Sequence, residues 1–236
     1  VESTGMGSVR IFVDGQEIVT DKLLMAVGRV PNAEELGLDE LGIELTEGSY
    51  IKTDDRLSTN VRGVYAAGDV TGKLAFTHAA DEMGRLAAGN ALGKGQRGRY
   101  RTHWIPWVTF TSPEVARIGM TEAVAAAHGG RVAELPLSEI DRAITDGSED
   151  GFIKLIVGPK RITRGLFGGQ LIGATIVAPR AGEMIHEIAL AMRVGMFTGR
   201  LAQTVHAYPS WSYGIQKAAG QFFGDVEGRT ARDAKG

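Results

Sequence analysis

An apolar run that ends in a glycine and an acidic residue constrains this chain more than any other stretch. Residues Gly63 to Val70 read Gly-Val-Tyr-Ala-Ala-Gly-Asp-Val, and an apolar-periodic segment follows from Leu74 to Leu92. We interpret this stretch as a strand that ends at Gly68, a carboxylate at its carboxyl end, Asp69, and a turn into a helix. In open α/β sheets, ligands lie beyond the carboxyl ends of strands, and the next helix offers free N–H groups at its N-terminus. The stretch therefore predicts a cofactor site.

The composition limits the other classes of function. The 236 residues suffice for one large domain or two ordinary ones, and a net charge of −2 does not indicate a nucleic-acid partner. No stretch approaches the roughly eighteen apolar residues of a membrane span, and the start does not resemble a signal peptide, so we expect a cytoplasmic protein. The sequence has no cysteine, which excludes disulfides, thiolate nucleophiles and Cys-ligated metals within it. Because a strand begins as early as Val9, we also expect a fragment of a longer sequence.

The first third of the chain contains turn signals between short apolar runs. Val9 to Val13 and Gln16 to Thr20 predict a β-hairpin, since the Asp-Gly pair between them suits a tight turn. Leu23 to Val27 predicts a buried strand, and the loop Gly28 to Asn32 that follows it allows close approach to a ligand through Gly28. An ordinary strand exit with a solvated Arg29 is an equal alternative. Beyond it we expect a short helix over residues 34–37 and a small strand over residues 50–53.

The segment after Asp69 predicts a helix from about Thr77 to Leu92, with small residues that let it sit close to a sheet. Residues 93–98 match the dinucleotide fingerprint Gly-x-Gly-x-x-Gly, but they follow a helix where that fingerprint must follow a strand. We therefore interpret residues 93–101 as a glycine-rich basic linker and place a domain boundary near Thr102. Nucleic-acid binding through this linker is a poor alternative in a chain of net negative charge.

Beyond the linker the pattern is that of an α+β domain, an antiparallel sheet with helices on one face. A helix begins at Glu122 with Thr121 as its N-cap, and a second, amphipathic helix covers Glu183 to Val194. A third helix follows Pro209 and runs to Phe223. Strands are expected at residues 115–118, 132–137, 151–157, 164–167 and 171–177, with a turn at residues 168–170.

Four separated stretches occur in one order: Ala26 to Asn32, Val64 to Val70, Phe110 to Gly119, which reads Phe-Thr-Ser-Pro-Glu-Val-Ala-Arg-Ile-Gly, and His206 to Ser210. Together they resemble the C-terminal half of the pyridine nucleotide–disulfide oxidoreductases, the flavoprotein family of dihydrolipoamide dehydrogenase, glutathione reductase and mercuric reductase. The resemblance covers nearly the whole chain, and four motifs in order are more specific than any one.

The resemblance implies a division into domains. Residues 1–32 correspond to the tail of the NAD(P)-binding domain, residues 33–102 to the end of the FAD-binding domain, and residues 103–236 to the dimerisation domain, which implies a homodimer. Asp69, with Gly68 before it, corresponds to the aspartate that accepts a hydrogen bond from the ribityl chain of FAD. The helix that begins with Thr77 and His78 points its N-terminus at the flavin, where it stabilises negative charge on the reduced ring. Gly28 and Arg29 match the loop beside the nicotinamide cofactor.

Two departures from the family pattern qualify this reading. The disulfide reductases carry a His before the proline of the last motif and a Glu five residues after it, and here these positions are Tyr208 and Tyr213. His206 lies two places earlier, and taken alone it is more often a structural histidine than a catalyst. A phenol, whose pKa is near 10, is a poor proton shuttle at neutral pH but a competent hydrogen-bond donor. The resemblance also implies a cis peptide bond between Tyr208 and Pro209.

The second departure is that the FAD fingerprint, the redox-active cysteine pair and the NAD(P) fingerprint are absent from these residues. The expected function is therefore that of the C-terminal portion of an FAD-dependent NAD(P)H oxidoreductase, which passes hydride to flavin and on to an atypical small-molecule acceptor. Tyr208, and with it His206, is the candidate catalytic position, with Tyr208 of the partner subunit beside the flavin. The alternative is a dimerisation module without chemistry, since the isolated chain is expected to bind FAD weakly or not at all.

Overall fold

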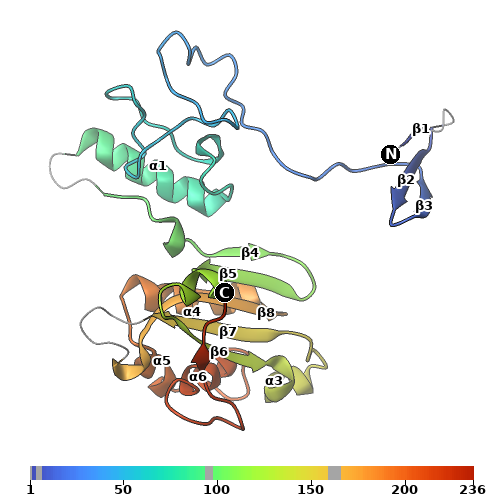
Figure 1. The fold of residues 1–236 in the computed structure, drawn as a ribbon, viewed down its shortest axis with the longest axis vertical. Helices are drawn as coiled ribbons and strands as arrows, with labels where there is room; N and C mark the ends of the chain where they lie inside the picture. The colour runs from blue at the N-terminus through green and yellow to red at the C-terminus, as the bar shows by residue number, and fades with distance from the viewer. Residues whose placement is uncertain (1, 4–6, 94–97, 159–165) are drawn as a thin grey trace.

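The computed structural model describes residues 2–3, 7–93, 98–158 and 166–236, and three parts follow one another along the chain (Figure 1). A small sheet lies near the N-terminus, a loop-rich segment surrounds one long helix, and a larger sheet with helices forms the rest. Of the expected linker over residues 93–101, residues 94–97 lie outside the described residues.

The N-terminal sheet confirms the expected hairpin. Strands β1 (Glu2–Ser3), β2 (Val9–Val13) and β3 (Gln16–Thr20) pair antiparallel in the order β1-β2-β3. Between β2 and β3, Asp14 and Gly15 have φ angles of 48° and 80°. These left-handed conformations match the twist of a two-residue hairpin turn.

The apolar segment Leu23 to Val27 does not form the strand that its composition predicts. Its backbone has no regular structure, and the side chains of Leu24 and Val27 are 87% and 88% exposed. A strand is stabilised by a neighbouring strand that pairs with its main chain, and no described residue supplies one to this segment. The predicted strand is therefore wrong for the described residues, within which this segment pairs with no strand.

The loop-rich segment between Ala33 and Phe76 also differs from expectation. Residues 34–37 form turns instead of a helix, and residues 50–53 contribute only an isolated bridge between Leu45 and Ile51. The run that ends in Gly68 forms only an isolated antiparallel bridge, between Ser58 and Tyr65, beside which the amide of Ala66 donates to the carbonyl of Leu57. A short 3₁₀-helix, η1 (Asp69–Thr71), starts at the acidic residue itself.

The long helix α1 (Thr77–Leu92) confirms the prediction for this segment. Its buried residues Ala79, Met83 and Ala87 pack in one apolar cluster with Leu57 and Tyr100. Small side chains at two of these positions let the helix approach the loops closely. Beyond it, η2 (Thr102–Trp104) leads into the larger sheet.

In the part of the chain that the structure describes, six antiparallel strands form the larger sheet, in the order β4-β5-β8-β7-β6-β9. They are β4 (Trp107–Thr109), β5 (Glu114–Gly119), β6 (Arg131–Pro136), β7 (Phe152–Gly158), β8 (Gln170–Ala178) and β9 (Arg232–Asp233). The four central strands confirm the sequence prediction, while the short edge strands β4 and β9 were not expected. Of the strand predicted over residues 164–167, the first two residues lie outside the described ranges, and Leu166–Gly168 forms a 3₁₀-helix, η4.

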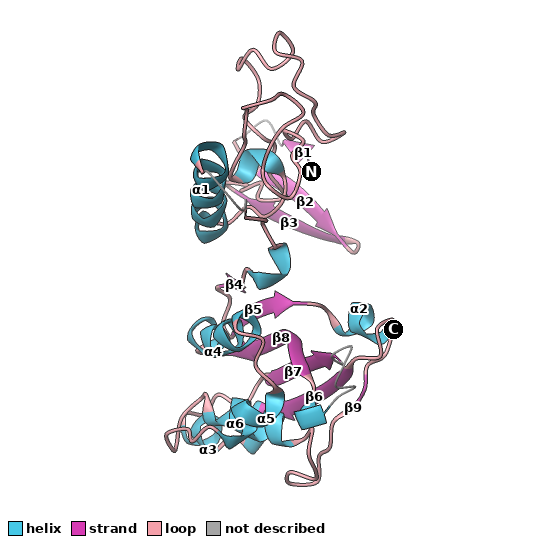
Figure 2. Ribbon diagram, turned by 90° about the vertical axis from the view of Figure 1, so that its left-hand side faces the viewer, coloured by secondary structure: helices cyan, strands magenta, loops and turns pink. Residues whose placement is uncertain are grey.

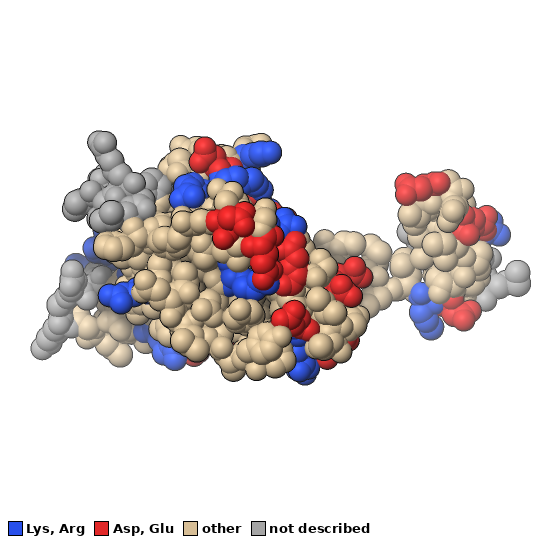
Figure 3. All heavy atoms as spheres, turned by 90° about the horizontal axis from the view of Figure 1, so that it is seen from below, with Lys and Arg blue, Asp and Glu red and all other residues tan. Residues whose placement is uncertain are grey.

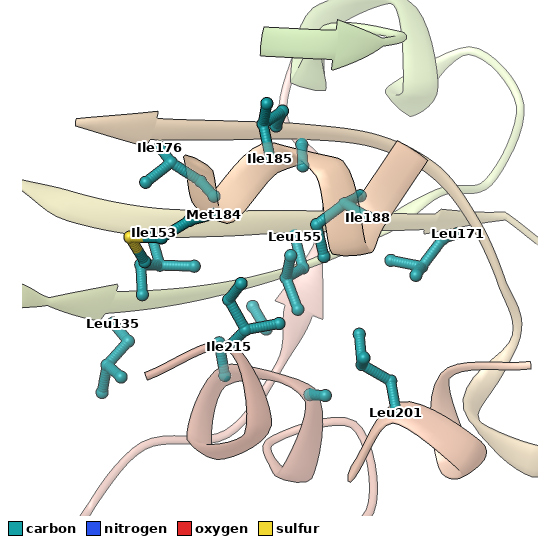
Figure 4. Close-up of a cluster of buried hydrophobic side chains, with 14 of the residues drawn as sticks. Leu135, Ile153, Leu155, Leu171, Ile176, Met184, Ile185, Ile188, Leu201 and Ile215 are labelled. Atoms are coloured by element: carbon teal, nitrogen blue, oxygen red, sulfur yellow. The ribbon is translucent and has the colours of Figure 1, made fainter. Parts of the chain in front are cut away.

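Helices α4 (Ala181–Arg193), α5 (Thr198–Gln203) and α6 (Tyr213–Gly220) lie on one side of this sheet (Figures 1 and 2). Figure 4 shows Ile185 and Ile188 of α4 directed towards the strands, near Leu155 and Ile176. All four side chains are fully or almost fully buried. This apolar layer is the main core of the molecule and confirms the antiparallel α+β architecture. The predicted third helix ends at Gly220, short of Phe223.

Two shorter helices complete this part, α2 (Glu122–Ala126) and α3 (Asp141–Thr145), the latter preceded by η3 (Leu137–Glu139). The Thr121 hydroxyl accepts a hydrogen bond from the Val124 amide at 3.2 Å, which confirms the predicted cap. Helix α2 packs on Val132 and Ile156, a cluster separate from that of α4 to α6. Because neighbouring residues of a strand point to opposite faces, α2 covers the second face of the sheet.

A network of ion pairs lies at the edge of the sheet where β9 pairs with β6. Glu122 accepts hydrogen bonds from Arg232 and, at 3.0 Å, from Lys154, which also lies 3.1 Å from Glu134. The Arg232 guanidinium is the main cause that lowers the pKa of Glu122 to about 2, with a smaller contribution from Lys154. On the face shown in Figure 3, acidic and basic side chains likewise lie next to one another.

Candidate functional site

Two residues that the sequence placed in separate motifs lie together in the structure. The Arg29 guanidinium Nη1 lies 3.5 Å from Asp69 Oδ2 and donates a hydrogen bond to the Ala75 carbonyl at 2.9 Å. The Tyr50 hydroxyl donates to the Arg29 carbonyl at 3.3 Å. The loop before residue 33 is therefore held against the turn that carries Asp69.

A cavity of about 300 Å³ opens at this point, lined among others by Arg29, Tyr50, Asp69 and Ala75. Gly68, the residue before this turn, has a φ of 83°, a backbone conformation that residues with a Cβ rarely adopt. A glycine is required there for Asp69 to project where it does. Gly28 lies beside Arg29, and no heavy atom would meet a Cβ built on it.

The N-terminus of α1 follows this turn within a few residues. Its N-cap is Phe76, whose side chain cannot accept a hydrogen bond, and no side chain caps the helix. Thr77 is exposed, while His78 Nε2 donates to the Pro106 carbonyl at 2.7 Å and its ring stacks on Phe76. The first-turn N–H groups of α1 are thus not satisfied by a side chain, and such groups attract electron-rich ligand atoms.

At the other end of the chain, Tyr208 has an acidic partner that sequence reasoning missed. Its hydroxyl donates to Asp141 Oδ2 at 2.7 Å, and its ring contacts Tyr213 edge to face at 5.7 Å. The hydrogen bond to Asp141 is the main cause that raises the pKa of Tyr208 above its usual range. The Tyr208 side chain is 65% exposed, and its peptide bond to Pro209 is cis, as expected.

His206 is held by different groups. Its Nδ1 lies 2.8 Å from the Thr204 carbonyl and its Nε2 lies 2.9 Å from Glu187 Oε1. Both neighbours are oxygen acceptors, so whichever ring nitrogen carries a hydrogen donates it to one of them. The His206 side chain is only 7% exposed. These contacts favour a structural anchor between the loop and α4, while the catalytic assignment of His206 stays a prediction.

Neither acidic partner had a signal in the sequence that could reveal its role. Asp141 lies 67 residues before Tyr208 and starts a helix of five residues, too short for a periodic pattern. Glu187 belongs to the polar side of α4, which periodicity predicts, but its contact with His206 depends on how the later loop returns to the helix.

Other kinds of site find no support in the residues that the structure describes. Within them, no group of three or more His, Asp or Glu side chains is placed to hold a metal ion. The helices of the described ranges are each too short or too polar to cross a membrane.

Comparison with known proteins identifies the family. Residues 2–84 match the family model "Pyridine nucleotide-disulphide oxidoreductase", and residues 105–219 match its dimerisation domain. A dihydrolipoyl dehydrogenase of Thermus scotoductus is 38% identical over 206 residues, which are 86% of this chain and 42% of the relative. An NAD(P)H dehydrogenase (quinone) of Mycobacterium tuberculosis is 36% identical over 99% of this chain and 47% of the relative.

The crystal structure of LpdA from Mycobacterium tuberculosis superimposes with a TM-score of 0.78 at 37% identity, over 89% of this chain and 44% of LpdA. The chain thus spans less than half the length of the relatives it matches. Both family models and the shared architecture agree with the four motifs. This chain belongs to the pyridine nucleotide–disulphide oxidoreductase family, whose members are flavin- and NAD(P)H-dependent oxidoreductases.

Proposed function

We propose that this chain forms part of an FAD-dependent NAD(P)H oxidoreductase whose electron acceptor is a quinone rather than a disulfide. In this proposal residues 1–32 belong to the NAD(P)-binding domain, residues 33–102 to the FAD-binding domain, and residues 103–236 to the dimerisation domain. The match of residues 105–219 to the family's dimerisation domain supports a homodimer.

The flavin half of the proposal rests on the turn around Asp69. An exposed carboxylate suits ligand hydroxyls, and the uncapped start of α1 suits an electron-rich ring, so the residues present fit FAD. When bound, FAD supplies the capacity to take up hydride and pass electrons on. Asp69 binds and orients in this scheme, Gly68 allows the turn, and Thr77 and His78 open the helix. Arg29, which now lies against Asp69, would face the nicotinamide side together with Gly28.

The acceptor half rests on one observation, the hydrogen bond from Tyr208 to Asp141. A disulfide reductase needs a proton shuttle at this position, and a phenol with a raised pKa cannot exchange its proton readily at neutral pH. The Tyr208 hydroxyl has one hydrogen, so it orients an oxygen-bearing acceptor by turning that hydrogen from Asp141 to the acceptor oxygen. The relative named NAD(P)H dehydrogenase (quinone) matches 99% of this chain, which favours a quinone.

Flavin content tests the assignment of Asp69. In the protein that contains this chain, Asp69→Ala is expected to lower the bound FAD per protein, because a hydrogen bond to a charged group contributes about 1.5–3 kcal/mol. Absorbance in the flavin region, compared with intact protein mass, measures the ratio. Asp81→Ala is the matched control, since Asp81 lies on α1 and pairs only with Arg85 among the described residues. Equal flavin content in both variants would overturn the assignment.

The preference for one electron acceptor over another tests the proposal that the acceptor is a quinone. The same protein should oxidise NADH or NADPH with a quinone at least about tenfold faster than with lipoamide or glutathione disulfide, because the usual proton-transfer pair contributes about 10²–10⁴-fold. Tyr208→Phe should slow quinone reduction without loss of flavin. Rapid disulfide turnover would contradict the proposal.

The second candidate is a dimerisation module without chemistry, favoured by the match of residues 105–219 to the family's dimerisation domain. A colourless dimer of two 236-residue chains that binds no added FAD would support this candidate.

A further inference from the structure

A cleft of about 730 Å³ lies between α1, the segment that follows it and the end of α4. This volume is in the range of small-molecule sites. None of its residues has a part in the proposed reaction. The side chains that matter most for its chemistry are Glu82, Tyr100, Arg101, Trp104 and Arg193.

Two arginines of the cleft share one indole ring. The guanidinium carbon of Arg101 lies 5.0 Å from the centroid of the Trp104 ring, and that of Arg193 lies 4.6 Å from it. Contacts of this kind attract a cation to the ring and restrict its side chain. Two positive groups from distant parts of the chain are therefore held near each other before any ligand binds.

Neither guanidinium has a counter-ion within the described ranges. No carboxylate of these residues lies within ion-pair distance of Arg101 or Arg193, whereas Arg99, which also lines the cleft, pairs with Asp55 at 2.6 Å. Glu82 lines the cleft too, but its carboxylate lies 3.6 Å from Arg85. Two like charges without a partner repel each other, and a bound anion relieves this repulsion.

Titratable groups around the cleft respond to charges of both signs. Burial first, and the charge of Arg101 second, lower the pKa of His103, the neighbour of Trp104. Burial first, and the charge of Glu82 second, raise the pKa of Tyr100. Tyr100 is 8% exposed, and its hydroxyl has no hydrogen-bond partner among the described residues. Guanidinium groups donate paired N–H bonds that match the oxygens of phosphates.

We propose that this cleft binds a small oxyanion of the diphosphate class, with Arg101 and Arg193 as its two ligands. One charge would neutralise only one of the two arginines, so at least two negative charges are required. Trp104 holds both guanidinium groups in place and thereby reduces the entropy that binding costs.

Inorganic pyrophosphate, titrated into the full chain at low ionic strength, tests this site by calorimetry and by tryptophan fluorescence. We expect saturable binding of one pyrophosphate per chain. Arg101→Gln and Arg193→Gln should each weaken it about tenfold or more, since each removes charge-assisted hydrogen bonds. Arg62→Gln is the matched control, because Arg62 is exposed, lies outside the cleft and has no carboxylate partner in the described ranges. Its affinity should equal that of the unchanged chain.

Two results of the affinity measurements would overturn the proposal. One is the absence of saturable binding, and the other is an equal loss of affinity in Arg62→Gln, which would indicate general attraction to positive charge. Trp104→Phe provides a further check, because the fluorescence response to pyrophosphate must disappear when the reporting indole is removed. A response that persists from the other tryptophans would place the anion elsewhere. Far-UV circular dichroism of each variant without pyrophosphate excludes unfolding as the cause.

Discussion

The larger sheet and the segment before residue 33 contain equally apolar runs, yet only one of them buries these side chains. Residues 171–177 belong to β8, which has β5 on one side and β7 on the other, and α4 packs across it. Residues 23–27 are just as apolar, but no described strand or helix packs on them. An apolar run thus forms a buried strand only where another strand or helix packs against it.

The largest expected effect lies in the well-packed layer. Ile185→Ala should lower the free energy of unfolding by about 2–5 kcal/mol, because it removes buried methyl groups and leaves a cavity under α4. Urea denaturation followed by circular dichroism measures the change. Leu190→Ala on the same helix is the control, since Leu190 is 63% exposed and its loss should cost less than about 0.5 kcal/mol. Equal losses of unfolding free energy in the two variants would show that burial in this layer does not stabilise the fold.

A smaller effect is expected at the charged edge of the same sheet. The folded-state pKa of Glu122 is about 2, below its ordinary value of 4.5, so its carboxylate stabilises the fold above pH 4.5, and this contribution is lost as the pH falls towards 2. Glu122→Gln should cost about 1–2 kcal/mol at pH 7, because Arg232 and Lys154 lose their partner.

Denaturation curves at pH 7, 4 and 2.5 measure this dependence on pH. The variant should lose less stability than the unchanged chain between pH 4.5 and 2. Glu149→Gln, at an exposed position, should leave the dependence unaltered. If Glu122→Gln and Glu149→Gln show the same dependence of stability on pH, the ion pairs of Glu122 do not stabilise the sheet edge at β9.

The smallest effect is expected in the unpartnered segment. Leu24→Ser should change the free energy of unfolding of this chain by less than about 0.5 kcal/mol, because the Leu24 side chain is almost fully exposed. The same urea titration measures it. A loss above about 1 kcal/mol would show that residues 23–27 pack on a surface and would erase the difference between the two regions.

Several elements were predictable because their information is local. The hairpin at Asp14 and Gly15, the cap at Thr121 and the helix from Thr77 each depend on neighbours within one or two turns of chain. Alternating apolar residues also predicted the four central strands. Helices α3 and α5 were missed because five or six residues are too few for a periodic pattern.

The features of the candidate site also fall into those that nearby residues predict and those that they do not. The motif around Asp69 predicted a ligand-facing carboxylate and a helix start, because turn, acid and helix are contiguous in the chain. It did not predict that Arg29 lies against Asp69, nor that the apolar run before Gly68 is limited to an isolated bridge between Ser58 and Tyr65. Both facts depend on how other segments return to this turn, which the motif itself does not contain.

The sequence by itself determined the family, the antiparallel α+β architecture and the absence of a histidine at position 208, since motifs, periodicity and residue identity are properties of the chain. Only the tertiary structure decided that Tyr208 donates to Asp141, that His206 is enclosed by Thr204 and Glu187, and that Arg101 and Arg193 meet on Trp104. Hydrogen bonds and cation contacts act over a few ångströms, so their partners are set by how the chain returns on itself rather than by spacing along it.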